Sequence, residues 1–381
     1  MRSFAALSLT FREFINASVK TARKVSLLLA LALFWPSFST AALPTFLHDP
    51  AALDDTTLAR AAKPALAAKI VTIVDKPAPS PTGDPHDYIS YGRYWWPDPA
   101  KPDGLPYIRR DGQHNRKQLE LGDRARLDAF INTVGTLALA WHRWHRAEDA
   151  VRAGEWLRTW LIARETRMKP ALDYSQIRLG RDGNRGSAAG VLEGRGLTAL
   201  VDALRLLHDS PALKAEEEAS VRQWFADYYH WLQTAPTARA EQAAANNHGS
   251  WFLVQAVVIA RYLGKDDEAR RLCEEDFARI GRQFRRDGSQ PLELARADAL
   301  GYSHFNLEAQ LQLARLARDL GVDLWNYEAP EGGSLKAGVA YVRPYNAAPE
   351  KWPHPQNEKL KPGFMDGMLA EAAGLDRGGA R

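Results

Sequence analysis

The chain has 381 residues, 45% of them hydrophobic and 25% charged, which is enough to bury one large core or two ordinary ones. Its formal charge is +4, but the first 41 residues contain five basic residues and one acidic residue, so the remainder carries a formal charge of 0. This balance argues against nucleic acid or a membrane surface as a partner, and the single Cys273 excludes an internal disulfide bond.

The N-terminal segment has the pattern of a secretory signal peptide. Three basic residues precede the apolar run 25–34, and small residues around Ala41 follow it. The run is too short to span a bilayer. We therefore expect residues 1–41 to be removed and residues 42–381 to form a single domain, a monomer without membrane contact, in the periplasm or outside the cell. A retained membrane anchor is the alternative.

The region before the first long helices is rich in proline and aromatic residues. The only alternating apolar pattern, Lys69–Val74, predicts a short strand. Prolines in residues 75–104 enforce extended and turn conformations. A linker seldom carries so many aromatic side chains, so we predict an ordered arm that packs on the helices. Its aromatic residues are Tyr88, Tyr91, Tyr94, Trp95, Trp96 and Tyr107.

From about Leu127 onward the sequence predicts helices. Stretches with helical spacing of apolar residues alternate with short Gly, Pro or Asp breaks, as where the stretch 313–320 ends at Gly321. Short connections favour antiparallel hairpins in a ring or stack. The segment 251–263 is apolar on all sides and is expected to be buried, whereas 149–157 has a polar face. The predicted fold class is all-α.

Several common catalytic motifs are missing from the sequence. It contains no Gly-x-Ser-x-Gly, no phosphate-binding or dinucleotide glycine motif and no His-Glu-x-x-His. His142 and His145 have a spacing that could share a metal ion, but the adjacent Trp141 and Trp144 favour an amphipathic helix. We therefore predict neither a metal nor another cofactor.

Two polar segments lie next to apolar helices. Asn247 and His248 occupy the first turn of the buried helix, where unpaired N–H groups and the helix dipole favour an anion. Helix capping and a buried core histidine are the alternative explanation. Arg296 precedes Tyr302 by six residues, and arginine is well shaped to bind a carboxylate. A surface ion pair and a core tyrosine would explain this second segment equally well.

Taken together, these segments resemble the alginate lyase superfamily of helical-toroid polysaccharide lyases. The resemblance covers roughly residues 75–356 and implies an (α/α)n toroid or incomplete barrel of antiparallel hairpins, with n about 6–7 and an extended N-terminal arm. The matching motifs, in the order of the family, are Tyr94–Tyr107 in the arm, Tyr174-Ser175-Gln176, Asn246-Asn247-His248, and Arg296 followed by Tyr302 and Phe305-Asn306-Leu307-Glu308.

The resemblance implies metal-independent β-elimination in a 1,4-linked uronic acid polymer. A base removes the C5 proton, and the neighbouring carboxylate must be neutralised as charge develops. The resemblance assigns neutralisation to Asn247, His248 and Arg296. Tyr302 would act as base and acid, held partly ionised by Arg296 and His248. His248 as base and Tyr302 as acid is the competing scheme, which suits guluronate.

The resemblance implies an anionic polysaccharide as substrate, and its identity stays open between mannuronate-rich alginate, glucuronan and mixed alginate. The six-residue spacing from Arg296 to Tyr302 departs from the best-known mannuronate lyases. Aromatic and amide side chains suit sugar binding, although core packing explains each tryptophan nearly as well. The predicted substrate-binding residues are Trp95, Trp96, Tyr174, Gln176 and His304.

Two other functions remain possible on the sequence alone. A helical-toroid glycoside hydrolase needs two carboxylates about 5 to 10 Å apart, and Glu193, Glu293 and Asp298 are available. A non-catalytic periplasmic uronan-binding protein would keep Arg296 and the aromatic residues but would not need Tyr302.

Overall fold

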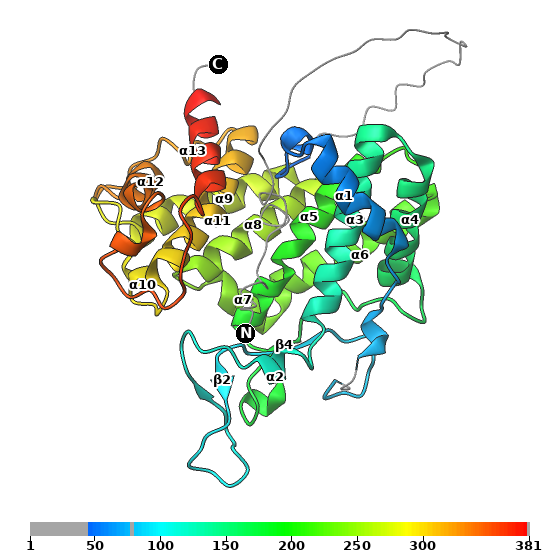
Figure 1. Ribbon diagram of the computed structural model, residues 1–381, viewed down its shortest axis with the longest axis horizontal. Coiled ribbons are helices and arrows are strands. Elements are labelled where there is room, and N and C mark those ends of the chain that lie inside the picture. The colour runs from blue at the N-terminus through cyan, green and yellow to red at the C-terminus, as the bar shows by residue number, and fades with distance from the viewer. Residues whose placement is uncertain (1–44, 77–79, 379–381) are drawn as a thin grey trace.

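The computed structural model describes residues 45–76 and 80–378. The expected signal peptide, residues 1–41, lies outside the described residues. Within them the chain forms thirteen α-helices and four short β-strands, so the all-α prediction is confirmed (Figure 1). No helix in the two described ranges has both the length and the apolar character to cross a membrane.

Four helices pack in succession through the middle of the molecule. Helix α3 (Arg124–Trp144) contacts α5 (Leu197–Leu206), α5 contacts α8 (Asn247–Tyr262), and α8 contacts α11 (Ala299–Asp319). Helix α8 is buried along almost its whole length because its apolar residues cover every side. Figure 1 shows the four helices side by side, which is the inner layer expected of a helical toroid.

Further helices cover the outside of this inner layer. Helices α1 and α4 pack on α3, helices α6, α7 and α9 pack on α8, and helices α10, α12 and α13 pack on α11. Together they complete the toroid of antiparallel hairpins. Their bounds are α1 Asp55–Ala67, α4 Ala147–Leu157, α6 Ala215–Thr234, α7 Pro236–Gln242, α9 Asp266–Gln283, α10 Pro291–Leu294, α12 Leu335–Val342 and α13 Asp366–Gly378.

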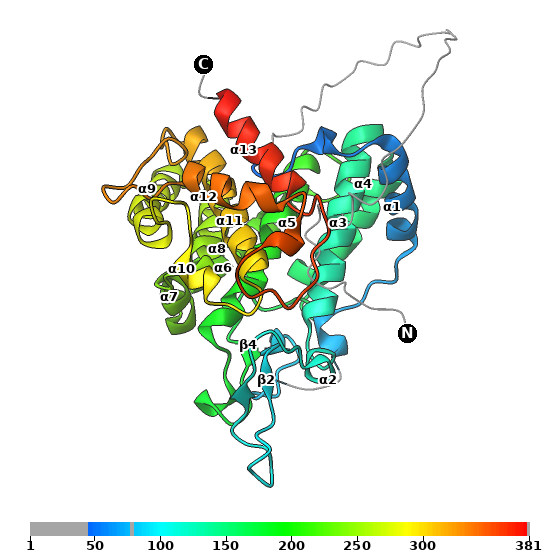
Figure 2. The ribbon, with the colours of Figure 1, turned by 60° about the vertical axis from the view of Figure 1, so that its left-hand side comes forward.

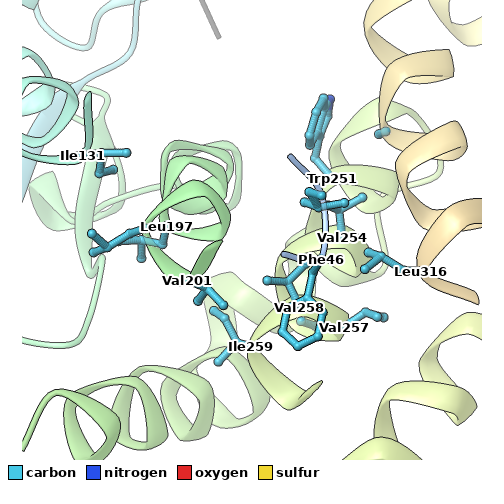
Figure 3. Packing of buried hydrophobic residues seen from close by; sticks show 14 of the residues in the cluster. Phe46, Ile131, Leu197, Val201, Trp251, Val254, Val257, Val258, Ile259 and Leu316 are labelled. Atoms are coloured by element: carbon cyan, nitrogen blue, oxygen red, sulfur yellow. The ribbon is translucent and has the colours of Figure 1, made fainter. Parts of the chain in front are cut away.

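One apolar core joins the layers. Figure 3 shows Val257 and Val258 of α8 packed close to Phe46, a residue from the start of the described chain. Full burial of an aliphatic or aromatic side chain contributes roughly 1.5–3 kcal/mol. Phe46 is fixed further by Asp202, which accepts its backbone N–H at 2.6 Å and that of Leu47 at 3.0 Å. The N-terminal residues are thereby tied to α5.

A buried polar network joins α8, α9 and α11. Ser250 donates to Asn306 at 2.8 Å, Asn306 donates to Gln283 at 3.0 Å, and Gln310 donates to Ser250 at 3.1 Å. All four side chains are buried, so each hydrogen bond replaces one to water and fixes a single register of the helices. The network lies directly behind the first turn of α8.

The arm forms two small sheets. Strand β1 (Ile89–Tyr91) pairs in parallel with β4 (Tyr174–Ile177), and β2 (Trp95–Trp96) pairs antiparallel with β3 (Ile108–Arg109). A short helix, α2 (Arg116–Leu119), follows. Figure 2 shows the strands together at one end of the helices, with α13 at the other end. The predicted ordered arm is therefore present.

Two expectations about strands are wrong. The segment Lys69–Val74 is not a strand, because its end turns into a 3-10 helix, Ile73–Asp75, whose first residue is fully buried. Thr72 and Asp75 close this turn with a reciprocal capping box. Strands β1 to β4 were not predicted, since segments of two to four residues are too short to show an alternating pattern.

Candidate active site

The first turn of α8 begins the site. Asn246 caps the helix, and its side chain accepts the backbone N–H of His248 at 3.4 Å. Gly249 is required here, because a Cβ atom would lie 2.2 Å from the carbonyl oxygen of Ala244. Capping therefore explains Asn246, but it does not explain the next two residues.

Asn247 is held by a buried carboxylate. Its backbone N–H donates to Glu293 at 2.8 Å, and its Nδ2 donates to the second carboxylate oxygen at 2.7 Å. Both side chains are almost completely buried. Burial raises the pKa of Glu293, and the two bonds from Asn247 offset part of that rise. The orientation of the Asn247 amide is thus fixed by Glu293, which lies on the short helix α10.

His248 is oriented by a second buried carboxylate. Its Nδ1 lies 2.6 Å from Glu241 Oε1, at the end of α7. The Glu241 side chain is 2% exposed, whereas that of His248 is 21% exposed. The contact occupies Nδ1, so Nε2 is the ring nitrogen that remains available to a ligand.

Arg296 and Tyr302 are in direct contact. The Nη2 of Arg296 donates to the phenol oxygen at 2.8 Å, and its guanidinium carbon lies 3.7 Å from the ring centroid. The same guanidinium donates to Asp111 of the arm at 2.8 and 3.2 Å. The charge of Arg296 is therefore already balanced by a carboxylate, as the surface ion-pair alternative predicted.

The surroundings of the Tyr302 phenol favour its protonated form over the phenolate. Its oxygen lies 2.8 Å from the hydroxyl of Tyr94 in the arm. Burial raises the pKa of Tyr302 well above its ordinary value, Tyr94 adds to the rise, and Arg296 opposes it without reversing it. Arg296 therefore does not bring the pKa of Tyr302 below its ordinary value, and His248 is turned toward Glu241. Partial ionisation of the phenol by these two residues stays a prediction.

Glu293 links the two halves of the site. Besides binding Asn247, it lies in the electrostatic field of both Arg296 and His248, which lower its pKa. The structure thus places Asn247, His248 and Arg296 around one buried carboxylate, with Tyr302 against Arg296. No group of three or more metal-binding side chains gathers anywhere in the described ranges.

The two tryptophans of β2 lie among arginines. Trp95 has Arg178 and Arg181 over its ring at 5.4 and 5.1 Å, and Trp96 has Arg110 at 5.7 Å. Both indoles are half-buried. A surface that combines aromatic faces with cations suits a sugar that carries a carboxylate.

The remaining predicted binding residues divide into two groups. Tyr174 is buried in a small cluster with Ile89 and Ile177, so core packing accounts for it. Gln176 has a left-handed backbone, with φ of 48°, and its N–H donates to Ser90 at 2.7 Å. Left-handed conformations cost energy in residues other than glycine and are concentrated at functional sites. Gln176 therefore stays a binding candidate.

His304 is not brought to this group of side chains. Its ring packs against Phe364, with the centroids 5.4 Å apart. Residues two apart on a helix point in different directions, so Tyr302 and His304 cannot share one face of α11. The prediction grouped Tyr302 and His304 because both residues lie in the same matching segment.

Sequence reasoning missed the partners of the predicted residues. Glu241 lies on a different helix from His248, and Asp111 lies 185 residues before Arg296. No sequence motif marks either carboxylate. Glu293 was considered only as a hydrolase carboxylate, and Tyr94 only as an aromatic residue of the arm. Buried charged side chains are almost always paired, so such partners are expected, but this expectation does not say which residues they are.

Comparisons with known proteins identify the family of the chain. A family model described as alginate lyase matches residues 72–352. The crystal structure of an alginate lyase from Bacteroides ovatus is 38% identical, has a TM-score of 0.79 and is matched over 84% of each chain. Alginate lyase A1-III from Sphingomonas species A1 is 16% identical, with a TM-score of 0.48 over 80% of this chain and 78% of that one. No curated protein matches.

Proposed function

The chain belongs to the alginate lyase family and is a polysaccharide lyase, and we propose that it cleaves mannuronate-rich alginate or glucuronan by metal-independent β-elimination. One observation carries the mechanism. The phenol oxygen of Tyr302 lies 2.8 Å from both Arg296 and Tyr94, at the place where a helix meets the arm. A half-buried phenol with two such neighbours is suited to exchange a proton with a substrate.

The first requirement of the reaction is to neutralise the substrate carboxylate. The C5 proton is α to this group, and its removal places further negative charge beside it. Donors that are already oriented stabilise such charge without reorganisation. His248 offers Nε2 and Arg296 offers its remaining N–H groups, whereas the Asn247 amide is fully buried and bound to Glu293. Glu241 holds His248 and Glu293 holds Asn247 in place, and neither carboxylate contacts substrate in this scheme.

Tyr302 carries out both proton transfers in this scheme. As a phenolate it takes the C5 proton, the electron pair forms the C4–C5 double bond, and the C4–O bond breaks. The phenol then returns the proton to the departing oxygen. One residue suffices because H5 and O4 lie on the same side of the ring in β-linked mannuronate and glucuronate. The N–H of Arg296 stabilises the phenolate when it forms.

The decisive experiment replaces Tyr302 by phenylalanine. Loss of general acid–base catalysis lowers turnover by roughly 10²- to 10⁴-fold, while polymer binding stays within a few fold. The assay follows the near-ultraviolet absorbance of the unsaturated uronate on polymannuronate, glucuronan and polyguluronate. Tyr327→Phe, at a tyrosine that packs on Phe277, is the matched control and keeps full activity.

Three outcomes of that experiment are informative. Near-normal turnover of Tyr302→Phe would refute the assignment. Activity confined to polyguluronate would favour His248 as the base, because H5 and O4 then lie on opposite faces. Absence of absorbance with all three polymers would reject the proposed substrates.

We further propose that the mature chain acts as a monomer in the periplasm or outside the cell. The apolar run and cleavage pattern of residues 1–41 support this location. Mass determination of the secreted protein tests both statements, since it gives the new N-terminus and the oligomeric state.

A further inference from the structure

Arg195 is a cation without a counter-ion. It ends a 3-10 helix, Ala188–Gly196, and its guanidinium lies over the rings of Trp251 and Phe305 at 5.8 and 5.4 Å. Among the described residues, its side chain donates no hydrogen bond, and no carboxylate lies within ion-pair distance. The contacts of its charge are thus with aromatic faces alone, which leaves its N–H groups available to a ligand.

The surroundings of Arg195 are positive as well. Burial lowers the pKa of Arg195 to about 10, and the nearby charges of Arg124 and Arg93 lower it further. Asp128 opposes this effect, but both of its oxygens are bound by Arg124 at 2.8 and 2.9 Å. Glu308 also opposes the effect and has another interaction of its own.

A second cation of this group, Arg93, also has no carboxylate within ion-pair distance among the described residues. Its side chain makes no hydrogen bond or ion pair within residues 45–76 and 80–378, and its charge acts on both Arg195 and Tyr302. It directly precedes Tyr94, whose hydroxyl contacts Tyr302. Among the described residues, neither of these two cations has a carboxylate within ion-pair distance, although Asp128 and Glu308 act on Arg195 and the charge of Arg93 acts on Glu358.

The position of Arg195 relative to the site follows from helical spacing. Trp251 follows His248 by three residues on α8, and Phe305 follows Tyr302 by three residues on α11. Residues three apart are neighbours on one helix face. Arg195 therefore contacts the residues that lie one turn along the two helices from His248 and Tyr302, a rise of roughly 4.5 Å. That distance is about the length of one sugar ring.

Resting on the function proposed above, we infer that Arg195, supported by Arg93, binds the carboxylate of the uronate ring next to the one that reacts. A uronic acid polymer carries one carboxylate on every ring, so a second cation one ring away matches its repeat. Arg296 is assigned to the carboxylate of the reacting ring in that scheme, so the neighbouring ring needs a separate cation. Arg195 is thus a substrate-binding residue and not one that moves protons.

The test measures affinity apart from turnover. Arg195→Gln is placed in the Tyr302→Phe background, and calorimetry gives the Kd of a mannuronate tetramer and of its methyl ester. We expect Arg195→Gln to weaken binding of the acid by tenfold or more and binding of the neutral ester by less than threefold. Arg195→Lys restores part of the lost affinity. Arg270→Gln, at an exposed residue of α9 that pairs with Glu274, is the matched control.

In the otherwise unaltered enzyme, Arg195→Gln raises KM with little change in kcat. A collapse of kcat at unchanged KM would place Arg195 on the reacting ring and overturn the inference. Equal weakening of acid and ester, or no weakening, would also overturn it. Circular dichroism and Tm confirm that each variant is folded. If the oligomer binds through Arg195 but is never cleaved, the lyase proposal fails while this inference stands.

Discussion

The arm and the helical core hold their residues by different forces. Helices α8 and α11 are fixed by apolar burial and by a buried network of amides, whereas the arm is held by charged contacts and by arginines over tryptophan rings. The proposed site lies where the two regions meet, through Tyr302 with Tyr94 and Arg296 with Asp111. The helices thus determine the positions of Arg296 and Tyr302, and the arm supplies the hydroxyl and carboxylate groups that act on their charges.

The helical side is expected to carry most of the stability. Leu307→Ala removes a fully buried side chain of α11 and costs about 2–5 kcal/mol of unfolding free energy. Denaturant unfolding measures the loss, and kcat at low temperature stays unchanged because the variant is still folded there. Leu121→Ala, at an exposed leucine of the arm, is the control and costs little. Equal losses of unfolding free energy in Leu307→Ala and Leu121→Ala would contradict the statement that the helices carry most of the stability.

The arm is expected to act on activity more than on stability. Asp111→Asn removes the charge partner of Arg296, and a hydrogen bond to a charged group contributes about 1.5–3 kcal/mol. We expect kcat to fall roughly 10- to 100-fold, since the guanidinium loses its fixed direction toward Tyr302. Tm changes little. Asp267→Asn, on an exposed part of α9, is the control, and a large fall in Tm with normal kcat would speak against this division.

The smallest expected effect concerns pH. Tyr94 raises the pKa of Tyr302, so Tyr94→Phe lowers that pKa. A base must be deprotonated, and activity therefore rises with pH through its pKa. The rise in kcat/KM should begin at lower pH in Tyr94→Phe than in the unaltered enzyme, with a change in maximal rate of about tenfold or less. A shift toward higher pH would show that Tyr94 stabilises the phenolate instead.

Local patterns in the sequence predicted the helical half of the site well. The apolar segment after Trp251 predicted a buried helix, and the Asn246 cap placed its start. The six-residue spacing left the roles of Arg296 and Tyr302 open until the family resemblance joined them, and the structure brings the two residues into contact. The buried helix was predictable because its signal depends only on residues within a few turns of one helix.

Long-range pairing was not predictable in the same way. Asp111 lies 185 residues before Arg296, and nothing in its own neighbourhood indicates that partner. His304 was grouped with Tyr302 because the two are close in the chain, although helix geometry separates them. Gln176 needed its backbone angle to stand out from Tyr174. Charge partners and strained backbone are properties of the folded chain, so one sequence does not reveal them.

The attachment of the N-terminal residues to Asp202 has a practical consequence for shortened forms of this protein. Asp202 accepts backbone N–H groups from Phe46, Leu47 and His48. A version that starts after His48 would leave the buried carboxylate of Asp202 without these hydrogen-bond donors. A buried carboxylate without donors lowers the free energy of unfolding far more than the loss of an exposed hydrogen bond does. Expression designs should keep every residue from Phe46 onward and place any tag before it.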